Sequence, residues 1–205
     1  DYRTLIPILK KEMLVLDIGC GTGSISRDIA NIIGDSGKVF GIDTTEKFIK
    51  SGKETYKATS NLELIHSDLF KFNPTQKFDL IISARTLQWL NNPKDALLKM
   101  KSLLNPKGVI SILDYNHNTI EWNPEPPVSM KEFYTTFLNW RCDAGMNNRI
   151  ADDLPKLMKD IGLIAIEKIN SDEHYERQRS DFKSKVGIWS KVAGSKQMVS
   201  EGYLD

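Results

Sequence analysis

Short apolar segments recur along the 205-residue chain and are separated by longer, more polar stretches. Six of these segments are rich in Val, Ile and Leu, and they span residues 13–18, 38–43, 62–66, 78–83, 109–114 and 163–169. Strands that are apolar along their whole length are typical of a parallel sheet that helices cover on both faces. The pattern therefore predicts a mostly parallel sheet of six strands.

Helical periodicity lies between most of the predicted strands. Apolar residues three or four positions apart predict helices over residues 24–33, 45–56 and 93–104. Pro93 fits the first turn of the last of these helices, and the turn-forming residues 105–108 end it. The resulting order, β-α-β-α-β-β-α-β, predicts an α/β fold of the Rossmann-like, doubly wound type.

The stretch from residue 116 to 150 has a different composition, and we call it the lid. Prolines at 124, 126 and 127 exclude a regular helix from its first part, whereas residues 128–145 form an amphipathic pattern rich in aromatic residues. A segment that follows the carboxyl end of a strand lies at the ligand-binding edge of an open α/β sheet. The lid helix either covers a ligand site or belongs to the second layer of the fold, and the sequence favours neither interpretation.

We expect residues 1–205 to form a single domain, because this length suits one α/β unit. Residues 1–115 are predicted to be the ligand-binding core. The lid follows at 116–150, and residues 151–205 are predicted to hold the last helices and the sixth strand.

A glycine loop joins the first strand to the first helix and is the most informative segment of the chain. Its spacing is G-x-G-x-G at Gly19, Gly21 and Gly23, so Ser24 stands where a dinucleotide fingerprint needs its third glycine. Glycines let a ligand approach the backbone, and the helix start offers free N–H groups. Asp17 precedes the loop, and its carboxylate repels a pyrophosphate but attracts an ammonium group. The loop therefore favours a nucleoside that carries an amino acid over a dinucleotide.

Two further acids follow the next two strands. Asp43 ends the second strand 20 residues after Gly23, a position from which a carboxylate can accept hydrogen bonds from ribose hydroxyls. Asp68 follows the third strand, where it can accept from an exocyclic amine beside the apolar Leu69 and Phe70. Each acid alone is commonly a cap or turn residue, but three at successive strand ends indicate a binding site.

At this point the chain resembles class I S-adenosylmethionine-dependent methyltransferases over roughly residues 10–115. The resemblance rests on ordered motifs: VLDIGCGTG, GIDTTEKFI, HSDLF, and FDLIISARTLQWL followed by NPKGVISILDYNH. The last two are similar to the small-molecule branch, which includes the ubiquinone and menaquinone methyltransferases. The resemblance implies S-adenosylmethionine as cofactor, S-adenosylhomocysteine as product and a small-molecule methyl acceptor.

The resemblance also implies roles for individual residues. Asp17, Gly19, Cys20, Gly21 and Gly23 would surround the methionine moiety of the cofactor, with Cys20 as a small filler and not a nucleophile. Asp43 would hold the ribose, Thr44 would pack near the adenosine, and Asp68 and the Leu69 amide would bind the adenine. Arg85 follows the fourth strand, where the backbone of the family's loop passes the methionine end.

Members of this family usually have seven strands, whereas only six can be counted here. The polar residues after 169 show no further strand pattern, and residues 5–9 look like the end of a helix that precedes the first strand. We therefore expect the seventh strand to be absent and the chain to lack residues at both ends.

Candidates for acceptor contacts cluster after the fourth and fifth strands and in the lid; they are Gln88, Trp89, Trp122, Tyr134, Trp140 and Arg141. Methyl transfer from a sulfonium is an in-line displacement, so alignment matters most and a base is needed only if the nucleophile must lose a proton. His117 and Tyr115 are the candidates for such a base. For His117 an exposed loop position is the commoner explanation. Arg141 could bind a carboxylate of the acceptor bidentately, but a surface ion pair is the commoner explanation. The aromatic lid residues are equally well explained as core.

Charge and cysteine content narrow the classes of protein to which the chain can belong. With 28 Lys and Arg against 27 Asp and Glu, the net charge of +1 argues against a dedicated nucleic-acid-binding protein. Residues 177–196 are a local exception, with six basic residues and one acid. As a helix they could bind RNA or an acidic partner. A solvated helix with one buried stripe is the commoner explanation. The two cysteines form neither a disulfide framework nor a metal-binding pattern, and no apolar run is long enough to span a membrane. A cytoplasmic protein is expected.

The sequence thus predicts an enzyme that transfers a methyl group from S-adenosylmethionine to a small molecule. The alternatives are methylation of RNA or protein through the basic segment, and a module that binds the cofactor without turnover. A nicotinamide-dependent dehydrogenase ranks last because the glycine spacing does not fit. The acceptor and the oligomeric state stay open.

Overall fold

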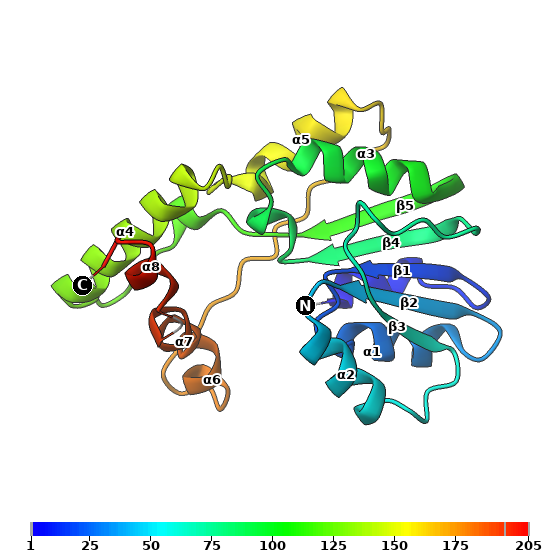
Figure 1. Cartoon of the computed structure of the whole chain (residues 1–205), viewed down its shortest axis with the longest axis horizontal. Coiled ribbons are helices and arrows are strands. Elements are labelled where there is room, and N and C mark those ends of the chain that lie inside the picture. Colours follow the sequence, from blue (N-terminus) through cyan, green and yellow to red (C-terminus); the bar gives the residue numbers. More distant parts are fainter. Residues whose placement is uncertain (1, 195, 205) are drawn as a thin grey trace.

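Five parallel strands form a single sheet in the computed structural model, which describes residues 2–194 and 196–204 (Figure 1). The strands are β1 (Leu14–Ile18), β2 (Lys38–Asp43), β3 (Leu62–His66), β4 (Phe78–Ala84) and β5 (Leu104–Leu113). Their spatial order is β3-β2-β1-β4-β5, so the chain reverses direction across the sheet between β1 and β4. This is the switch point at which doubly wound folds bind their ligands.

Helices cover both faces of the sheet, as the periodicity predicts. On one face lie α1 (Ser24–Ile33) and α2 (Glu46–Thr55), and on the other α3 (Pro93–Leu103) and α5 (Ile150–Asp160) (Figure 1). Short 3-10 turns are η1 (Tyr2–Ile8), η2 (Leu87–Trp89) and η3 (His117–Thr119). The remaining helices are α4 (Val128–Asp143), α6 (Phe182–Val186), α7 (Ile188–Gly194) and α8 (Gln197–Ser200). The predicted helices at 24–33, 45–56, 93–104 and 128–145 are confirmed to within a few residues at their ends.

The strands divide their apolar side chains between two cores. Alternate residues such as Leu16 and Ile81 face α3 and α5, whereas Val15 and Leu80 face α1. All four of these side chains are fully buried. The central strands are apolar on both faces because helices cover both sides of the sheet. The strands are parallel, so their carboxyl ends form one edge, and the acids lie at this edge.

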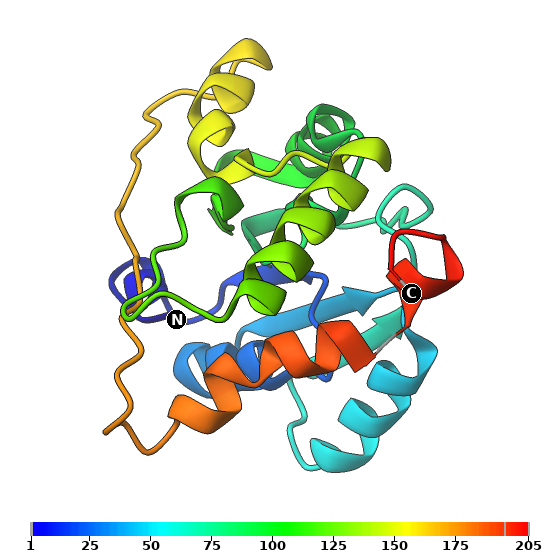
Figure 2. The same ribbon diagram turned by 90° about the vertical axis from the view of Figure 1, so that its left-hand side faces the viewer.

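The lid helix α4 lies beyond the carboxyl ends of the strands and not on a face of the sheet (Figure 1). Figure 2 views this edge and shows α4 and α7 crossing in front of it. The two helices pack together because Trp189 of α7 contacts Tyr134 and Phe137 of α4, with ring centroids 5.1 and 5.5 Å apart. The position of α4 favours its interpretation as a cover of the ligand-binding edge and not as a second-layer helix.

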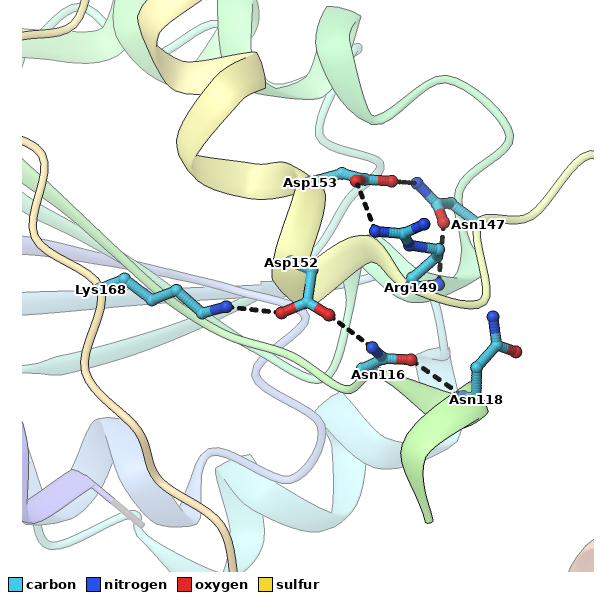
Figure 3. A network of polar contacts seen from close by, with 7 residues as sticks. All are labelled: Asn116, Asn118, Asn147, Arg149, Asp152, Asp153 and Lys168. Atoms are coloured by element: carbon cyan, nitrogen blue, oxygen red, sulfur yellow. Dashed lines mark hydrogen bonds and ion pairs between the residues drawn. The ribbon is translucent and has the colours of Figure 1, made fainter.

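The predicted sixth strand at 163–169 is wrong. Among the described residues no strand follows β5, and residues 163–169 run as irregular chain. Ala165 has a φ of 53°, which interrupts an extended conformation, and Ile164 is 89% exposed. Lys168 instead forms an ion pair with Asp152 at the start of α5 (Figure 3). No strand that could serve as a seventh lies among the described residues after 169.

The basic segment 177–196 does not form one long helix. It makes the two short helices α6 and α7, which are joined at Gly187. Trp189 and Val192 turn toward α4 and contribute to a cluster around Phe137, Trp140 and Met198. One apolar side of the segment is therefore covered, in line with a solvated helix that has one buried stripe.

Gly52 allows a close contact between α2 and the glycine loop. A β-carbon at this position would lie 2.3 Å from the Thr22 carbonyl oxygen and 2.6 Å from Leu64 Cδ1. Gly→Ala inside a helix is normally stabilising by up to ~1 kcal/mol, but here the clash is with backbone, which cannot rotate away. We therefore expect Gly52→Ala to lower the free energy of unfolding by about 1–3 kcal/mol in urea denaturation.

Gly194 at the end of α7 provides the matched control. Among the described residues nothing lies within 4 Å of a β-carbon built there. Gly194→Ala should leave the stability unchanged or raise it slightly. A Gly52→Ala protein as stable as wild type would show that α2 does not rest on the loop.

Candidate functional site

The glycine loop between β1 and α1 is held by the carboxyl end of β2. The N–H groups of Gly19 and Cys20 both donate to the Ile42 carbonyl, at 2.9 and 3.1 Å. The next glycine, Gly21, donates its N–H to Asp43 Oδ2 at 2.9 Å. Three consecutive amides are thus bound by two neighbouring residues, so the loop has a defined conformation.

The three glycines of the loop serve different purposes, although all have left-handed φ values of 58° to 80°. A β-carbon at Gly19 would lie 2.1 Å from Thr86 Oγ1, and one at Gly23 would lie 2.7 Å from Leu64 Cδ2. Nothing among the described residues lies within 4 Å of the same position at Gly21. Gly19 and Gly23 therefore permit packing, whereas Gly21 leaves its backbone open to a ligand.

Asp17 lies beneath this loop and is only 2% exposed. Its Oδ2 accepts a hydrogen bond of 2.6 Å from the Ser26 hydroxyl in α1. Burial, with a contribution from the nearby Asp43 charge, raises the pKa of Asp17 to about 6. A cationic group bound above the loop would favour the ionised form, so the site is suited to an ammonium or sulfonium group.

Asp43 is half-buried, and its carboxylate is oriented by backbone on both sides. Besides the bond from Gly21, its Oδ1 accepts the Thr45 N–H at 2.8 Å. Each oxygen retains a further lone pair, which can accept from a hydroxyl group. The neighbouring Thr44 is exposed, and its carbonyl lies 3.0 Å from His66 Nε2.

Asp68 and Leu69 follow β3 at the same edge. Asp68 Oδ1 accepts the Phe70 N–H at 2.7 Å, so the residue closes a turn, and Leu69 is buried in the core. Cys20 is partly buried against Gly41, and burial raises the pKa of its thiol. A thiol of this kind is a poor nucleophile, which agrees with its interpretation as a filler.

Arg85 directly follows β4, and its backbone N–H and carbonyl are both hydrogen-bonded within the chain. Its φ is 60°, and its N–H donates to the Leu113 carbonyl at 2.7 Å. The guanidinium lies 3.7 Å from Glu173 and 5.3 Å from the ring centre of Tyr115. The side chain is therefore engaged with the segment after α5, and Tyr115 lies beside it at the end of β5.

Gln88 is the centre of a buried polar network that joins four segments of the chain. Its N–H donates to Asp114 Oδ2 at 3.2 Å, and its side-chain amide donates to the Arg85 carbonyl at 3.2 Å. Its Oε1 lies 2.6 Å from His117 Nε2, and its carbonyl accepts from Arg141 Nη2 at 2.7 Å. The end of β4, the end of β5 and the lid thus meet at one residue.

His117 is buried, with 6% exposure, so its expected position as an exposed loop residue is wrong. Because the amide nitrogen of Gln88 is engaged with Arg85, the amide oxygen faces the imidazole, and His117 Nε2 must carry the proton. Burial and the charge of Arg141 lower the pKa of His117 to about 4. The ring is therefore neutral at physiological pH, and no described residue donates to its buried Nδ1.

Arg141 is also buried, with no exposed surface, and the expected surface ion pair is wrong. Its Nε donates to Asn148 Oδ1 at 2.7 Å, and its guanidinium lies between the rings of Trp89 and Phe137. The sequence did not reveal this, because a single Arg on an aromatic helix gives no sign of which residues cover it.

The remaining aromatic candidates divide between two roles. Trp140 is buried and donates its Nε1–H to Glu201 Oε2 at 2.6 Å, which makes it part of the contact with the C-terminal helices. Tyr134 donates its hydroxyl to the His117 carbonyl at 2.6 Å. Trp122 is half-buried against Tyr134 and Trp189. Of these three, Tyr134 lies nearest to the Gln88 network.

Figure 3 shows a second polar network that fixes the end of the lid. Asn116 donates to Asp152, which also binds Lys168, and Asn147 donates to Asp153 at 2.8 Å. These contacts secure the start of α5 and leave Asn116 in a structural position.

Asp114 is a residue that the sequence analysis missed. It follows β5 just as Asp17, Asp43 and Asp68 lie at the ends of their strands, and this parallel was a usable signal. Burial raises its pKa to about 6, although hydrogen bonds from Gln88 and Tyr115 lower it.

Comparison with known proteins identifies the family. A profile described as a methyltransferase domain matches residues 9–200. The chain belongs to this family. The resemblance carried by the sequence motifs is therefore confirmed.

Relatives and solved structures agree with this assignment. The chain is 36% identical over 105 residues to malonyl-[acyl-carrier protein] O-methyltransferase 2 of Ilyobacter polytropus. This match covers 51% of the chain and 40% of that protein. It is 29% identical over 113 residues to demethylmenaquinone methyltransferase of Staphylococcus aureus, covering 55% of the chain and 47% of that protein. The chain therefore spans less than half of the length of either relative.

The fold is shared with a solved S-adenosylmethionine-dependent methyltransferase from Aquifex aeolicus. The TM-score is 0.60 at 23% identity, and the match covers 79% of each chain. The predicted Rossmann-like α/β class is confirmed. In the described part of the chain, no helix is both long and apolar enough to cross a membrane.

Replacement of Asp17 by Asn tests the electrostatics beneath the loop. Since burial raises its pKa from 3.8 to about 6, folded Asp17 keeps a proton that the unfolded chain has already lost. Its stabilising contribution is complete below the lower value and is lost as the pH rises through about 6, by on the order of 3 kcal/mol. Relative to wild type, Asp17→Asn should therefore gain stability between about pH 4.5 and about pH 7.5 in urea denaturation without ligand.

Asp35→Asn is the control, because Asp35 is exposed and lies outside the site. Its stability difference from wild type should be the same at both pH values. A pH-independent difference for Asp17→Asn would mean that Asp17 is not desolvated.

Proposed function

We propose that the chain is the catalytic domain of an S-adenosylmethionine-dependent methyltransferase that transfers a methyl group to a small-molecule acceptor. The observation that carries the proposal is the edge of the sheet where Gly21 offers open backbone between the carboxyl groups of Asp17 and Asp43. Membership of the methyltransferase domain family supports it. The names of the relatives, which act on malonyl-acyl-carrier protein and demethylmenaquinone, agree with a metabolic acceptor.

The residues at this edge fit the cofactor. Asp17 favours the positive charge of the methionine end, and the open backbone at Gly21, between the packed Gly19 and Gly23, leaves room for it. Asp43 has acceptor capacity for two ribose hydroxyls, and Thr44 lies exposed beside it. Asp68 and Leu69 are proposed to receive the adenine, with the exposed Phe70 beside the base.

Bound S-adenosylmethionine would supply an activated methyl group, so the chain itself must align the acceptor and exclude water. The Gln88 network and the lid lie on the side of the β4 and β5 ends, beyond the proposed methionine position. The neutral His117, whose Nδ1 accepts no hydrogen bond from a described residue, is the proposed group for taking a proton from an acceptor that must lose one. Tyr115 does not suit this role, because burial raises the pKa of its hydroxyl and a protonated phenol cannot take a proton. A carboxylate acceptor would need neither.

The basic segment gives no specific support to RNA as a substrate. Its apolar side packs on α4, and Arg179 is paired with Asp181 at 2.8 Å. Binding without turnover stays open as an outcome of the test. Incubation with methyl-labelled S-adenosylmethionine and a metabolite extract should label a small molecule and release S-adenosylhomocysteine. Tight cofactor binding with no labelled product from any extract would favour a non-catalytic module.

Asp43→Ala tests the cofactor assignment. The substitution removes charged acceptors for the ribose hydroxyls and also releases the Gly21 amide. Charge-assisted hydrogen bonds of this kind contribute about 1.5–3 kcal/mol, so the Kd for S-adenosylhomocysteine should rise roughly 10- to 150-fold. Isothermal titration calorimetry measures this directly.

Asp43→Asn is the matched variant for the charge. It keeps one acceptor oxygen and the shape of the side chain, so its affinity should fall between those of wild type and Asp43→Ala. Unchanged affinity in both variants would remove Asp43 from the cofactor site.

A further inference from the structure

Arg141 is a buried cation that forms no direct ion pair in the described part of the chain. Burial lowers its pKa, and the charge of Asp114, which acts on it without a direct contact, offsets part of this effect. None of its side-chain surface is exposed, yet among the described residues no carboxylate lies within ion-pair distance of it. Desolvation of an unpaired charge costs several kcal/mol. The aromatic rings of Trp89 and Phe137, at 4.9 and 5.4 Å from Cζ, recover only part of this cost.

The hydrogen bonds of Arg141 leave one end of its guanidinium unused. Nε is bound by Asn148, and Nη2 is bound by the Gln88 carbonyl. Nη1, which carries two N–H groups, is buried and has no partner in the described part of the chain. Both existing acceptors are neutral oxygens, so the hydrogen-bonding capacity of the group is not satisfied, and its charge is balanced only from a distance by Asp114.

The position of Arg141 links this unmet requirement to the reaction. Arg141 Nη2 donates to the carbonyl of Gln88, and the side chain of Gln88 donates to the carbonyl of Arg85. The next residue, Thr86, packs against Gly19 of the glycine loop. On its other side the guanidinium is covered by Trp89, whose side chain is 45% exposed. Because this indole is half-exposed, its rotation would open one face of the guanidinium without unfolding the lid.

We propose that Arg141 is the recognition residue for a carboxylate carried by the methyl acceptor. This inference rests on the proposed function, because it concerns the acceptor side of the same site. A carboxylate supplies a negative charge in direct contact and accepts from both N–H groups of Nη1, in a charge-assisted geometry that arginine favours. A neutral acceptor would satisfy the N–H groups but would leave the cation without a direct ion pair. No second cation contacts Arg141 among the described residues, which favours a singly charged group over a phosphate.

The test compares matched acids and amides in the presence of S-adenosylhomocysteine. Butyrate, succinate and benzoate are titrated against butyramide, succinamide and benzamide, with the thermal unfolding midpoint as the readout, and chloride and sulfate are included. We expect at least one carboxylate to stabilise the wild-type chain and its amide to have no effect. Arg141→Gln should weaken carboxylate binding at least tenfold, about 1.4 kcal/mol, and Arg141→Lys should retain part of it.

Arg149→Gln is the matched control, because it removes the same charge from an exposed residue eight positions away. Its carboxylate response should equal that of wild type. The Kd of Arg141→Gln for S-adenosylhomocysteine should stay within about threefold of wild type, a readout that general misfolding would change.

Several results would overturn the assignment. They are equal stabilisation by acids and amides, equal stabilisation by chloride, or an undiminished carboxylate response in Arg141→Gln. If Arg141→Gln does not fold, the comparison of acids with amides in wild type still decides. If wild type does not bind S-adenosylhomocysteine, the proposed function fails, whereas the same titration of the ligand-free chain still tests Arg141.

Discussion

The attachment of the glycine loop to the end of β2 is the interaction on which the cofactor side of the structure depends. Two amides share the Ile42 carbonyl, and the amide of Gly21 binds the side chain of the next residue, Asp43. The β1–β2 ladder therefore continues into the loop and does not stop at the last strand residue. A loop held in this way loses little further conformational entropy when a ligand binds, so its open backbone is preorganised.

The same attachment makes the two carboxyl groups interdependent. Asp43 orients the loop, and its charge adds to the burial that raises the pKa of Asp17. Without a ligand this arrangement is electrostatically unfavourable, since one acid is desolvated near another. A cation placed above the loop relieves both effects at once, so the fold stores at this edge a preference for a positively charged ligand.

The sequence predicted this side of the site far better than the other. The glycine loop and the acids at 17, 43 and 68 are local features, because each follows directly from its position at the end of an apolar strand. His117 and Arg141 were assigned to the surface because nothing near them in the sequence shows what covers them. Their burial depends on Gln88, which lies 29 and 53 residues away. The false sixth strand has the same origin: an apolar segment shows that a strand is possible, but not that a partner edge is paired with it.

This difference between local and assembled parts has a functional meaning. Cofactor recognition is proposed to use backbone amides and strand-end acids, which the architecture of the sheet brings to one edge. Acceptor recognition is proposed to use single side chains from the ends of β4 and β5 and from α4, which only tertiary packing brings together. Because the Gln88 network joins these segments through a few hydrogen bonds, a substitution in the lid can alter the acceptor pocket without moving the glycine loop. A fold of this kind can keep its methyl donor while its acceptor changes, so on this proposal the lid, and not the sheet, determines which acceptor binds.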